Sequence, residues 1–540
     1  MDQVICNAKV YLAREKFAQA VWIRGEHIIL AGTNEAALAA AGKDARRINA
    51  GGNLLVPGFH DSHLHLAFFG REMMAIPAAG VTSVEELIQR GRETIKRLTL
   101  RPGAVVTGRG WDQEQFTDEK RLPSRHDLDR ISAEHAVILS RKCGHIVCCN
   151  TRALHMAGIF RPVPMVAGGQ IDVDEAGEPT GILRENAMDL ALRIVPEPDA
   201  GQMEAQLAYA MRHALENGLT AVASQDVTGG DIDSFTGAYK KLYGKGLRLR
   251  VTQQAGIGCM EHLNEYIRRG YRTGTTLHAP YLKMGPLKLF ADGSLGSRTA
   301  LLRKSYSDAP ETKGIRVLDK GVMAAYIEKA AQNGLQAAVH AIGDGAMDTV
   351  LSCFEAVTKE HENPLRHGIV HCQITDRPLL SRMAKNDILA LVQPIFVKSD
   401  MHMAQKRVGR ELASTSYAFH TMERLHMHVA YGSDCPVETL SPLKGIACAV
   451  SRKDFDSGSD DVFFPEERVD VYTAVDSYTL GSAYANFDEK RMGRIREGYL
   501  ADLVLLDRDI FTIPPEEIGG AKVLFTMVGG EMAYQNGAVG

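Results

Sequence analysis

Residues 54–65 have the sequence LLVPGFHDSHLH, in which an apolar run leads into a His-x-His pair. In an extended strand, side chains two positions apart point to the same side. His63 and His65 can therefore face the same interior and hold one metal ion through imidazole nitrogens. Asp61 shares their parity and is expected to support them, whereas His60 has the opposite parity and should face away. The pair alone is a weak signal, because two structural histidines would give the same pattern.

Outward from this stretch, apolar segments alternate with amphipathic ones, which is typical of parallel α/β folds. The segments predicted as strands are 54–59, 219–225, 247–254, 285–291, 335–341, 368–373, 388–396 and 429–434. Eight β/α units match a (β/α)₈ TIM barrel, which carries its catalytic groups at the C-terminal ends of the strands. The sequence therefore predicts an α/β chain built around a TIM barrel.

Three later strand ends carry residue types that bind metals. His340 ends the fifth segment, His371 lies near the end of the sixth, and Asp434 closes the eighth. A single strand-end histidine is usually structural. Four histidines and one aspartate on four strands, in this order, favour a metal site with His63 and His65.

The fourth predicted strand contains Lys288 between apolar neighbours. A charged lysine is costly to bury, and lysine shifts its pKa readily on burial. A neutral amine can add CO₂ to form a carbamate, which would bridge two metal ions as a carboxylate does. The alternative is a charged lysine paired with a neighbour such as Asp292.

The two ends of the chain are rich in short β-segments. Because chain ends commonly lie close together, we expect residues 1–57 and 486–540 to form one composite β-sandwich domain. Residues 58–485 would then form the metal-dependent TIM barrel. The gap between the first two strands is too long for one helix, which indicates an insertion at about residues 70–205.

The composition narrows the class of protein. The chain has 540 residues, of which 45% are hydrophobic and 24% charged, with a net charge of −4. No basic excess points to nucleic acid, and no stretch is apolar enough to span a membrane. The nine cysteines contain no CxxC pair, which favours reduced thiols in the cytoplasm. The partner expected is a small-molecule substrate, and whether the protein forms a homo-oligomer is left open.

Longer motifs connect the chain to a known family. Residues 287–300 (LKLFADGSLGSRTA) form the most specific motif, and residues 108–112 (GRGWD) and 432–434 (GSD) are further matches. On these motifs the chain resembles the amidohydrolase superfamily, in particular amidohydrolase family 3. This YtcJ-like branch includes the N-substituted formamide deformylases.

The resemblance implies a site with two metal ions. It implies His63 and His65 as ligands of one ion, His340 and His371 as ligands of a second, and a carboxylated Lys288 between them. Asp434 would be both a ligand and the general base. The resemblance also suggests a set of substrate-binding residues: Trp111, Asp112, His145 and Arg298.

The function expected from these residues is hydrolysis of an amide-type C–N bond by water activated on one or two divalent metal ions, with zinc preferred. One alternative is a mononuclear deaminase of the same superfamily, with Lys288 unmodified and His371 in catalysis. A second is a barrel without catalysis that serves as a regulatory protein.

Overall fold

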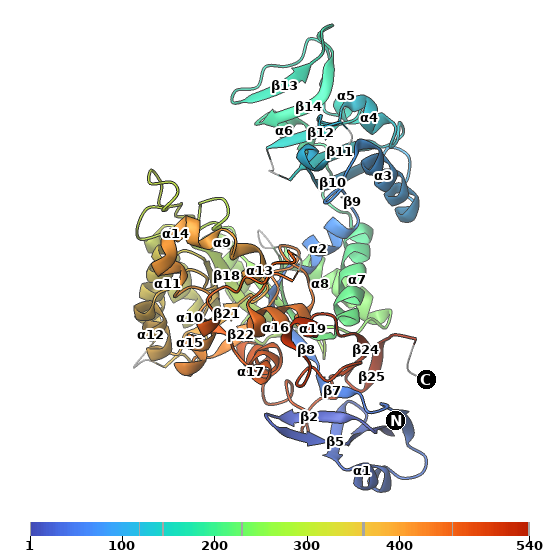
Figure 1. Ribbon diagram of the computed structural model, residues 1–540, viewed down its shortest axis with the longest axis vertical. Coiled ribbons are helices and arrows are strands. Elements are labelled where there is room, and N and C mark those ends of the chain that lie inside the picture. Colours follow the sequence, from blue (N-terminus) through green and yellow to red (C-terminus); the bar gives the residue numbers. More distant parts are fainter. Residues whose placement is uncertain are drawn as a thin grey trace. The chain divides into compact units, whose positions relative to one another are not determined.

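The chain folds into two compact units. The computed structural model describes residues 2–117, 119–142, 145–227, 231–358, 362–455 and 457–537. Unit 1 comprises Met1–Leu66 and Leu207–Gly540, and unit 2 comprises Ala67–Gln206 (Figure 1). The segment expected to be an insertion, about 70–205, lies inside unit 2.

Unit 1 contains a sheet of eight parallel strands that forms a barrel, with the short β17 (Thr276–His278) attached to β18. The hydrogen-bonded order is β22-β21-β20-β19-β18-β16-β15-β8. The strands are β8 (Phe59–Leu64), β15 (Leu219–Val227), β16 (Arg250–Gly256), β18 (Leu282–Phe290), β19 (Ala337–Ala341), β20 (Gly368–His371), β21 (Leu389–Val392) and β22 (Val429–Tyr431). The predicted TIM-barrel fold is confirmed.

The ring closes between its first and last strands at their C-terminal ends. The backbone N–H of Asp434 donates to the carbonyl of His63 at 2.9 Å, and the N–H of His65 donates to the carbonyl of Cys435 at 2.9 Å. These two bonds hold His63, His65 and Asp434 beside one another, although Asp434 lies far along the chain.

The first barrel strand differs from the prediction of 54–59. Leu54–Pro57 forms β7, which pairs with β23 (Leu503–Leu506) in a different sheet, and the barrel strand begins only at Phe59. The chain passes between the two sheets at Gly58, where a Cβ would lie 2.2 Å from Oγ1 of Thr220. Only glycine allows this close approach. Because the apolar run continues through this point, the sequence gives no signal that the chain leaves one sheet and enters another.

The two ends of the chain form two packed sheets, as a β-sandwich requires. One sheet has the order β25-β24-β23-β7-β2-β3 and the other the order β5-β4-β1-β6. Their bounds are β1 (Asp2–Cys6), β2 (Lys9–Ala13), β3 (Lys16–Ala18), β4 (Ala20–Arg24), β5 (His27–Gly32), β6 (Arg46–Asn49), β24 (Val523–Val528) and β25 (Glu531–Gln535). Buried residues from both ends, including Ile5, Val21, Leu505 and Phe525, share one core.

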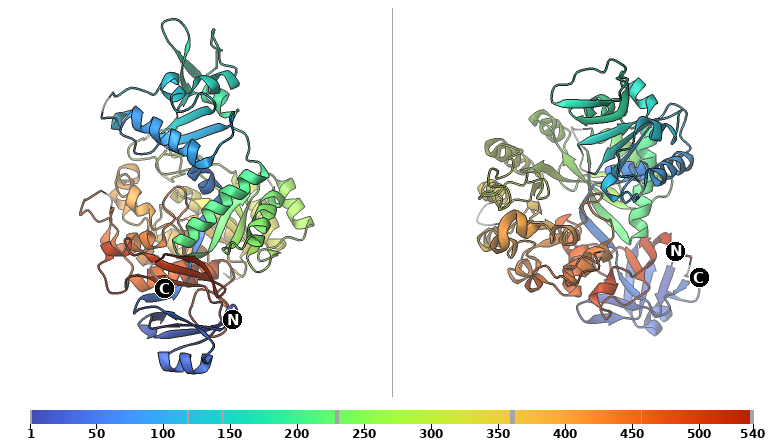
Figure 2. Two further views of the ribbon diagram at one scale, coloured as in Figure 1. Left: turned by 90° about the vertical axis from the view of Figure 1, so that its right-hand side faces the viewer. Right: turned by 45° about the horizontal axis from the view of Figure 1, so that its top comes forward.

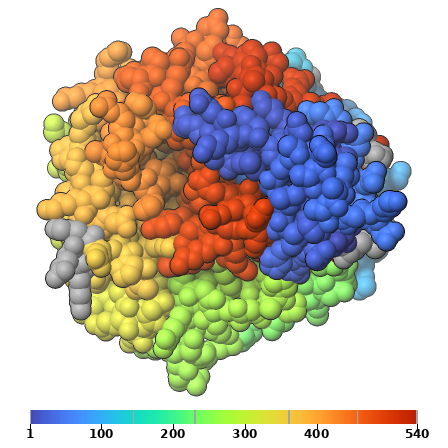
Figure 3. Space-filling view, turned by 90° about the horizontal axis from the view of Figure 1, so that it is seen from below, coloured from blue at the N-terminus to red at the C-terminus, as the bar shows by residue number. Residues whose placement is uncertain are grey.

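The figures show how the chain ends meet in unit 1. In Figure 2 the N-terminal and C-terminal segments lie at the same end of this unit, and Figure 3 shows blue N-terminal residues against red C-terminal ones. The composite sandwich therefore pairs segments from the two ends of the chain, which lie more than four hundred residues apart in the sequence.

Helices cover the outside of the barrel, as α10 (Lys320–Gln332), α11 (Asp344–Val357) and α12 (Arg377–Lys385) do side by side. Asp319 and Asp376 cap the first turns of α10 and α12 by accepting backbone N–H bonds, which fixes where these helices begin. In the described part of the chain, no helix has the length and apolarity needed to cross a membrane.

Unit 2 has a sheet and a core of its own. The sheet order is β13-β14-β12-β11-β10-β9. Its strands are β9 (Ile76–Pro77), β10 (Val105–Trp111), β11 (Ala136–Arg141), β12 (Ile146–Cys149), β13 (Gly169–Val173) and β14 (Pro179–Glu185). Helix α3 (Val84–Leu98) buries Leu87 and Ile88 in the same core as Val137 and Leu139.

Candidate metal centre

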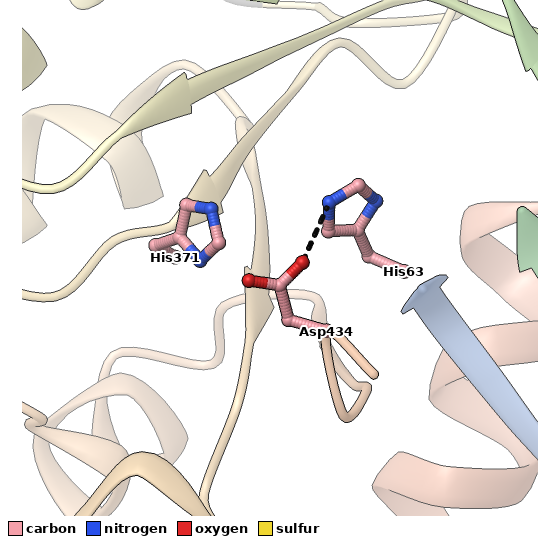
Figure 4. Close-up of side chains that lie close together, drawn as sticks. All are labelled: His63, His371 and Asp434. Atoms are coloured by element: carbon pink, nitrogen blue, oxygen red, sulfur yellow. Dashed lines mark ion pairs between the residues drawn. The ribbon is translucent and has the colours of Figure 1, made fainter. Parts of the chain in front are cut away.

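Three of the predicted ligands lie together at the mouth of the barrel. The ligand atoms of His63, His371 and Asp434 lie within 4.8 Å of one another, and all three residues are buried (Figure 4). Oδ1 of Asp434 is 3.4 Å from Nε2 of His63 and 3.1 Å from Nε2 of His65. The ring of His340 lies 4.4 Å from that of His371 between centroids. The barrel thus brings together the four histidines and the aspartate that the sequence singled out.

Two buried glutamines orient the two deepest imidazoles. Nδ1 of His63 donates to Oε1 of Gln254 at 2.8 Å, and Nδ1 of His371 donates to Oε1 of Gln393 at 2.8 Å. Because an amide oxygen only accepts, these bonds place the proton on Nδ1 and leave the Nε2 lone pair free for a metal. Neither glutamine was predicted from the sequence. Their signal is an amide side chain in or just after an apolar barrel strand.

Backbone carbonyls orient the other two imidazoles. Nδ1 of His65 donates to the carbonyl of Gln225 at 3.1 Å, and Nε2 of His340 donates to the carbonyl of Gly293 at 3.0 Å. His65 therefore offers Nε2, like His63, whereas His340 offers Nδ1. Each ring thus has one nitrogen held by a neighbouring acceptor, and Nε2 of both His63 and His65 faces Oδ1 of Asp434.

Burial keeps the imidazoles of His63, His340 and His371 neutral, the form in which histidine binds a metal. It holds the pKa values of His63 and His371 well below the ordinary value for histidine, and it lowers the pKa of His340 to about 3. Neutral rings with one free nitrogen are suited to Zn²⁺ and similar ions.

Lys288 lies in this centre without a hydrogen-bond partner among the described residues. It is 1% exposed, and its Nζ makes no hydrogen bond. Burial lowers the pKa of Lys288 to about 7. The alternative partner, Asp292, instead accepts backbone N–H bonds from Leu301, Ile342 and Gly343. Lys288 interacts electrostatically with His63, His340, His371 and Asp434, and its Nζ lies over the ring of Phe290 at 3.8 Å from the centroid. A buried amine without a hydrogen-bond partner in this position fits the bridging group of a two-metal site.

Asp61 holds the backbone of the site in place, and its side chain lies on the same side of the strand as His63, as its parity predicts. Its buried carboxylate accepts the backbone N–H of His63 at 3.0 Å and that of Ser433 at 3.0 Å. Burial raises the pKa of Asp61 to about 7. His60 points the other way, where its Nε2 accepts Nδ2 of Asn486 at 3.2 Å.

Several residues of the centre have left-handed backbone. The φ values of His371, Cys372 and Asp434 are 78°, 47° and 57°. Such conformations cost a non-glycine residue on the order of 1–3 kcal/mol and cluster at functional sites. The backbone bond from Asp434 to His63 helps to hold this conformation in place.

The residues predicted to bind substrate have partners within their own units. Trp111 is buried in the core of unit 2, where its Nε1 donates to the carbonyl of Leu139 at 3.1 Å. The structure therefore gives Trp111 a packing role. The other three form ion pairs: Asp112 with Arg141, His145 with Glu185, and Arg298 with Asp308. Their roles in substrate binding stay predictions.

The model of the Amidohydrolase family matches residues 46–534 of this chain. The chain belongs to the amidohydrolase family. The resemblance drawn from the motifs is thereby confirmed, and the protein is a hydrolase of that superfamily.

Relatives of this amidohydrolase span most of its length. The putative amidohydrolase YtcJ of Bacillus subtilis (strain 168) is 35% identical over 499 residues, 91% of this chain and 91% of that protein. N-substituted formamide deformylase of Arthrobacter pascens is 27% identical over 550 residues, 99% of this chain and 98% of that protein. The crystal structure of an uncharacterized metal-dependent hydrolase from Pyrococcus furiosus has a TM-score of 0.78 at 30% identity, covering 95% of this chain and 100% of that one.

Removal of the Gln254 side-chain amide should weaken metal binding. We expect Gln254→Leu to lower the affinity for Zn²⁺ by about 10–100-fold, because His63 loses the bond that sets its tautomer. Competition with a chromogenic chelator measures this affinity. Gln253→Leu is the matched control, since Gln253 is also buried in β16 but donates to the carbonyl of Ser224 at 3.0 Å. Equal losses in the two variants would contradict the orienting role of Gln254.

Proposed function

We propose that this amidohydrolase cleaves an amide-type C–N bond of a small-molecule substrate with the help of one or two divalent metal ions. The observation that carries the proposal is the buried group of His63, His371 and Asp434 next to the unpaired amine of Lys288. N-substituted formamide deformylase, which aligns along almost the whole chain, supports the choice of bond.

The residues present divide into two sets of ligands. His63 and His65 would hold one ion through Nε2. His371, through Nε2, and His340, through Nδ1, would hold a second. Addition of CO₂ to the neutral amine of Lys288 forms an Nζ–C bond and releases one proton to solvent. The resulting carbamate would lie between the two sets.

Asp434 carries the proton in the proposed reaction. When bound, divalent ions such as Zn²⁺ acidify water and polarise a carbonyl. Asp434 accepts the proton of the attacking water through its carboxylate. The new C–O bond forms, the C–N bond breaks, and Asp434 returns the proton to the leaving nitrogen. The products are a carboxylic acid and an amine.

Elemental analysis of the purified full-length chain, combined with a hydrolysis screen of N-acyl and N-formyl compounds, tests this function. Close to two metal ions per chain and release of an amine would support it. One ion, with release of ammonia from an aminated ring, would establish the mononuclear deaminase instead. No bound metal after reconstitution would overturn the proposal and favour the regulatory barrel.

A further inference from the structure

A small apolar pocket opens beside the candidate metal centre. Its volume is about 290 Å³, and its apolar wall is formed by Ile257, Leu289, Phe290, Val317, Leu318 and Tyr326. The pocket lies over the C-terminal ends of β15, β16 and β18, the side of the barrel on which ligands bind. Lys288 is among the residues that line it, so the pocket adjoins the candidate metal centre at this residue.

The chemistry of the pocket points to an uncharged ligand group. No carboxylate or guanidinium is among the residues that line the pocket, and the one amine among them, that of Lys288, is buried. Phe290 and Val317 are 38% and 56% exposed, so apolar surface is available to a ligand. Its volume is near the lower limit of ligand pockets, about 300–1,000 Å³, which suits one ring or a short branched alkyl group.

Gln225 places an amide oxygen without a hydrogen-bond partner among the described residues in the lining of this pocket. The residue is 7% exposed, and Oε1 of its side chain has no hydrogen-bond partner among the described residues. A Cβ at position 256 would lie 2.9 Å from Nε2 of Gln225, so Gly256 leaves the room that this amide occupies. An unpaired buried amide oxygen is unfavourable unless a donor, such as the N–H of a ligand or a water molecule, completes its bonds. The Gln225 backbone carbonyl accepts a hydrogen bond from Nδ1 of His65, so Gln225 contacts a proposed metal ligand through its backbone and lines the pocket as well.

We propose that this pocket binds a compact apolar substituent of an amide substrate, and that the side chain of Gln225 hydrogen-bonds the substrate's amide group. The proposal rests on the function proposed above and assigns its substrate class: uncharged secondary amides with one ring or branched alkyl group.

Ligand-observed NMR on the full-length, metal-containing protein tests the pocket. The probes are N-cyclohexylacetamide and N-methylacetamide, which share an amide but differ in apolar volume. We expect the cyclohexyl compound to bind at least about tenfold more tightly. Gln225→Leu should weaken the binding of both by about three- to tenfold.

A pair of loop variants provides the matched control. Val317→Asp places a carboxylate in the apolar wall and should weaken binding of the cyclohexyl probe by at least about tenfold. Ile315→Asp changes a similarly exposed residue of the same segment that does not line the pocket, and it should leave binding unchanged. Both positions are more than half exposed, so both variants should fold.

The same spectra separate the two proposals. Equal affinity for the two probes, or equal effects of Val317→Asp and Ile315→Asp, would overturn the proposal that this pocket binds an apolar substituent. Acetate and cyclohexylamine appear in the spectrum if the probe is hydrolysed. Selective binding without hydrolysis of any amide in the screen would overturn the proposed function but support the pocket.

Discussion

Asp434→Asn will lower kcat for amide hydrolysis by about 10²–10⁴-fold while the protein still binds metal. Asparagine has the same shape as aspartate, and its Oδ1 can still lie near Nε2 of His63 and Nε2 of His65. Its amide, however, cannot accept and return a proton. The four histidines remain in place, so metal binding should weaken but persist.

The measurement for Asp434→Asn is kcat on the best amide from the screen, with the metal content of each preparation determined in parallel. Glu438→Gln is the control, because Glu438 is a nearby, partly buried carboxylate outside the proposed ligand set. It should keep turnover close to that of the wild type. Wild-type turnover in metal-loaded Asp434→Asn would rule out Asp434 as the general base.

In the proposed two-metal site, Lys288→Met should reduce the metal content from two ions to about one and lower kcat by at least about 10²-fold. Methionine fills a similar volume but cannot form a carbamate, so the link between the two sets of ligands is lost. Bound metal per chain and kcat are the two measurements. A variant with two tightly bound ions and full turnover would contradict the bridging role.

The same substitution should raise the stability of the metal-free protein at neutral pH. Burial lowers the pKa of Lys288 to about 7, whereas an unfolded lysine keeps its proton up to about pH 10.4. Between these values the unfolded chain binds more protons, so wild-type stability rises with pH. Lys288→Met removes this group, and its stability advantage should be largest below pH 7 and shrink toward pH 10.

Lys283 provides the control for this stability experiment, because it lies in the same strand but has partners. Its Nζ donates to Oδ2 of Asp488 at 2.6 Å and to the carbonyl of Asn486 at 2.5 Å. Lys283→Met leaves Asp488 short of one partner and should lower the free energy of unfolding, with the metal content unchanged. Urea unfolding of chelator-treated protein measures both variants. A loss of stability in Lys288→Met as large as that in Lys283→Met would contradict this prediction, and would show that the contact of Lys288 with the Phe290 ring outweighs the cost of burying its amine.

Most of the barrel could be predicted because its signals are local. Apolar segments such as 219–225 and 429–434 coincide with barrel strands, and their C-terminal residues all reach one end of a parallel barrel. Parity also separated Asp61, which supports the centre, from His60, which faces away. The first strand was misplaced because the apolar run at 54–59 continues through the point where the chain changes sheets.

The sequence by itself determined the fold class, the family, and the residue types at the strand ends, since each depends on spacing along the chain. Only the tertiary structure decided which nitrogen each histidine offers, because the groups that hold the other nitrogen, such as the amides of Gln254 and Gln393, come from elsewhere in the chain. It also decided that Trp111 packs in a core and that Lys288 has no hydrogen-bond partner in the described part of the chain. These features depend on contacts between residues that are distant in sequence, and such contacts leave no periodic pattern.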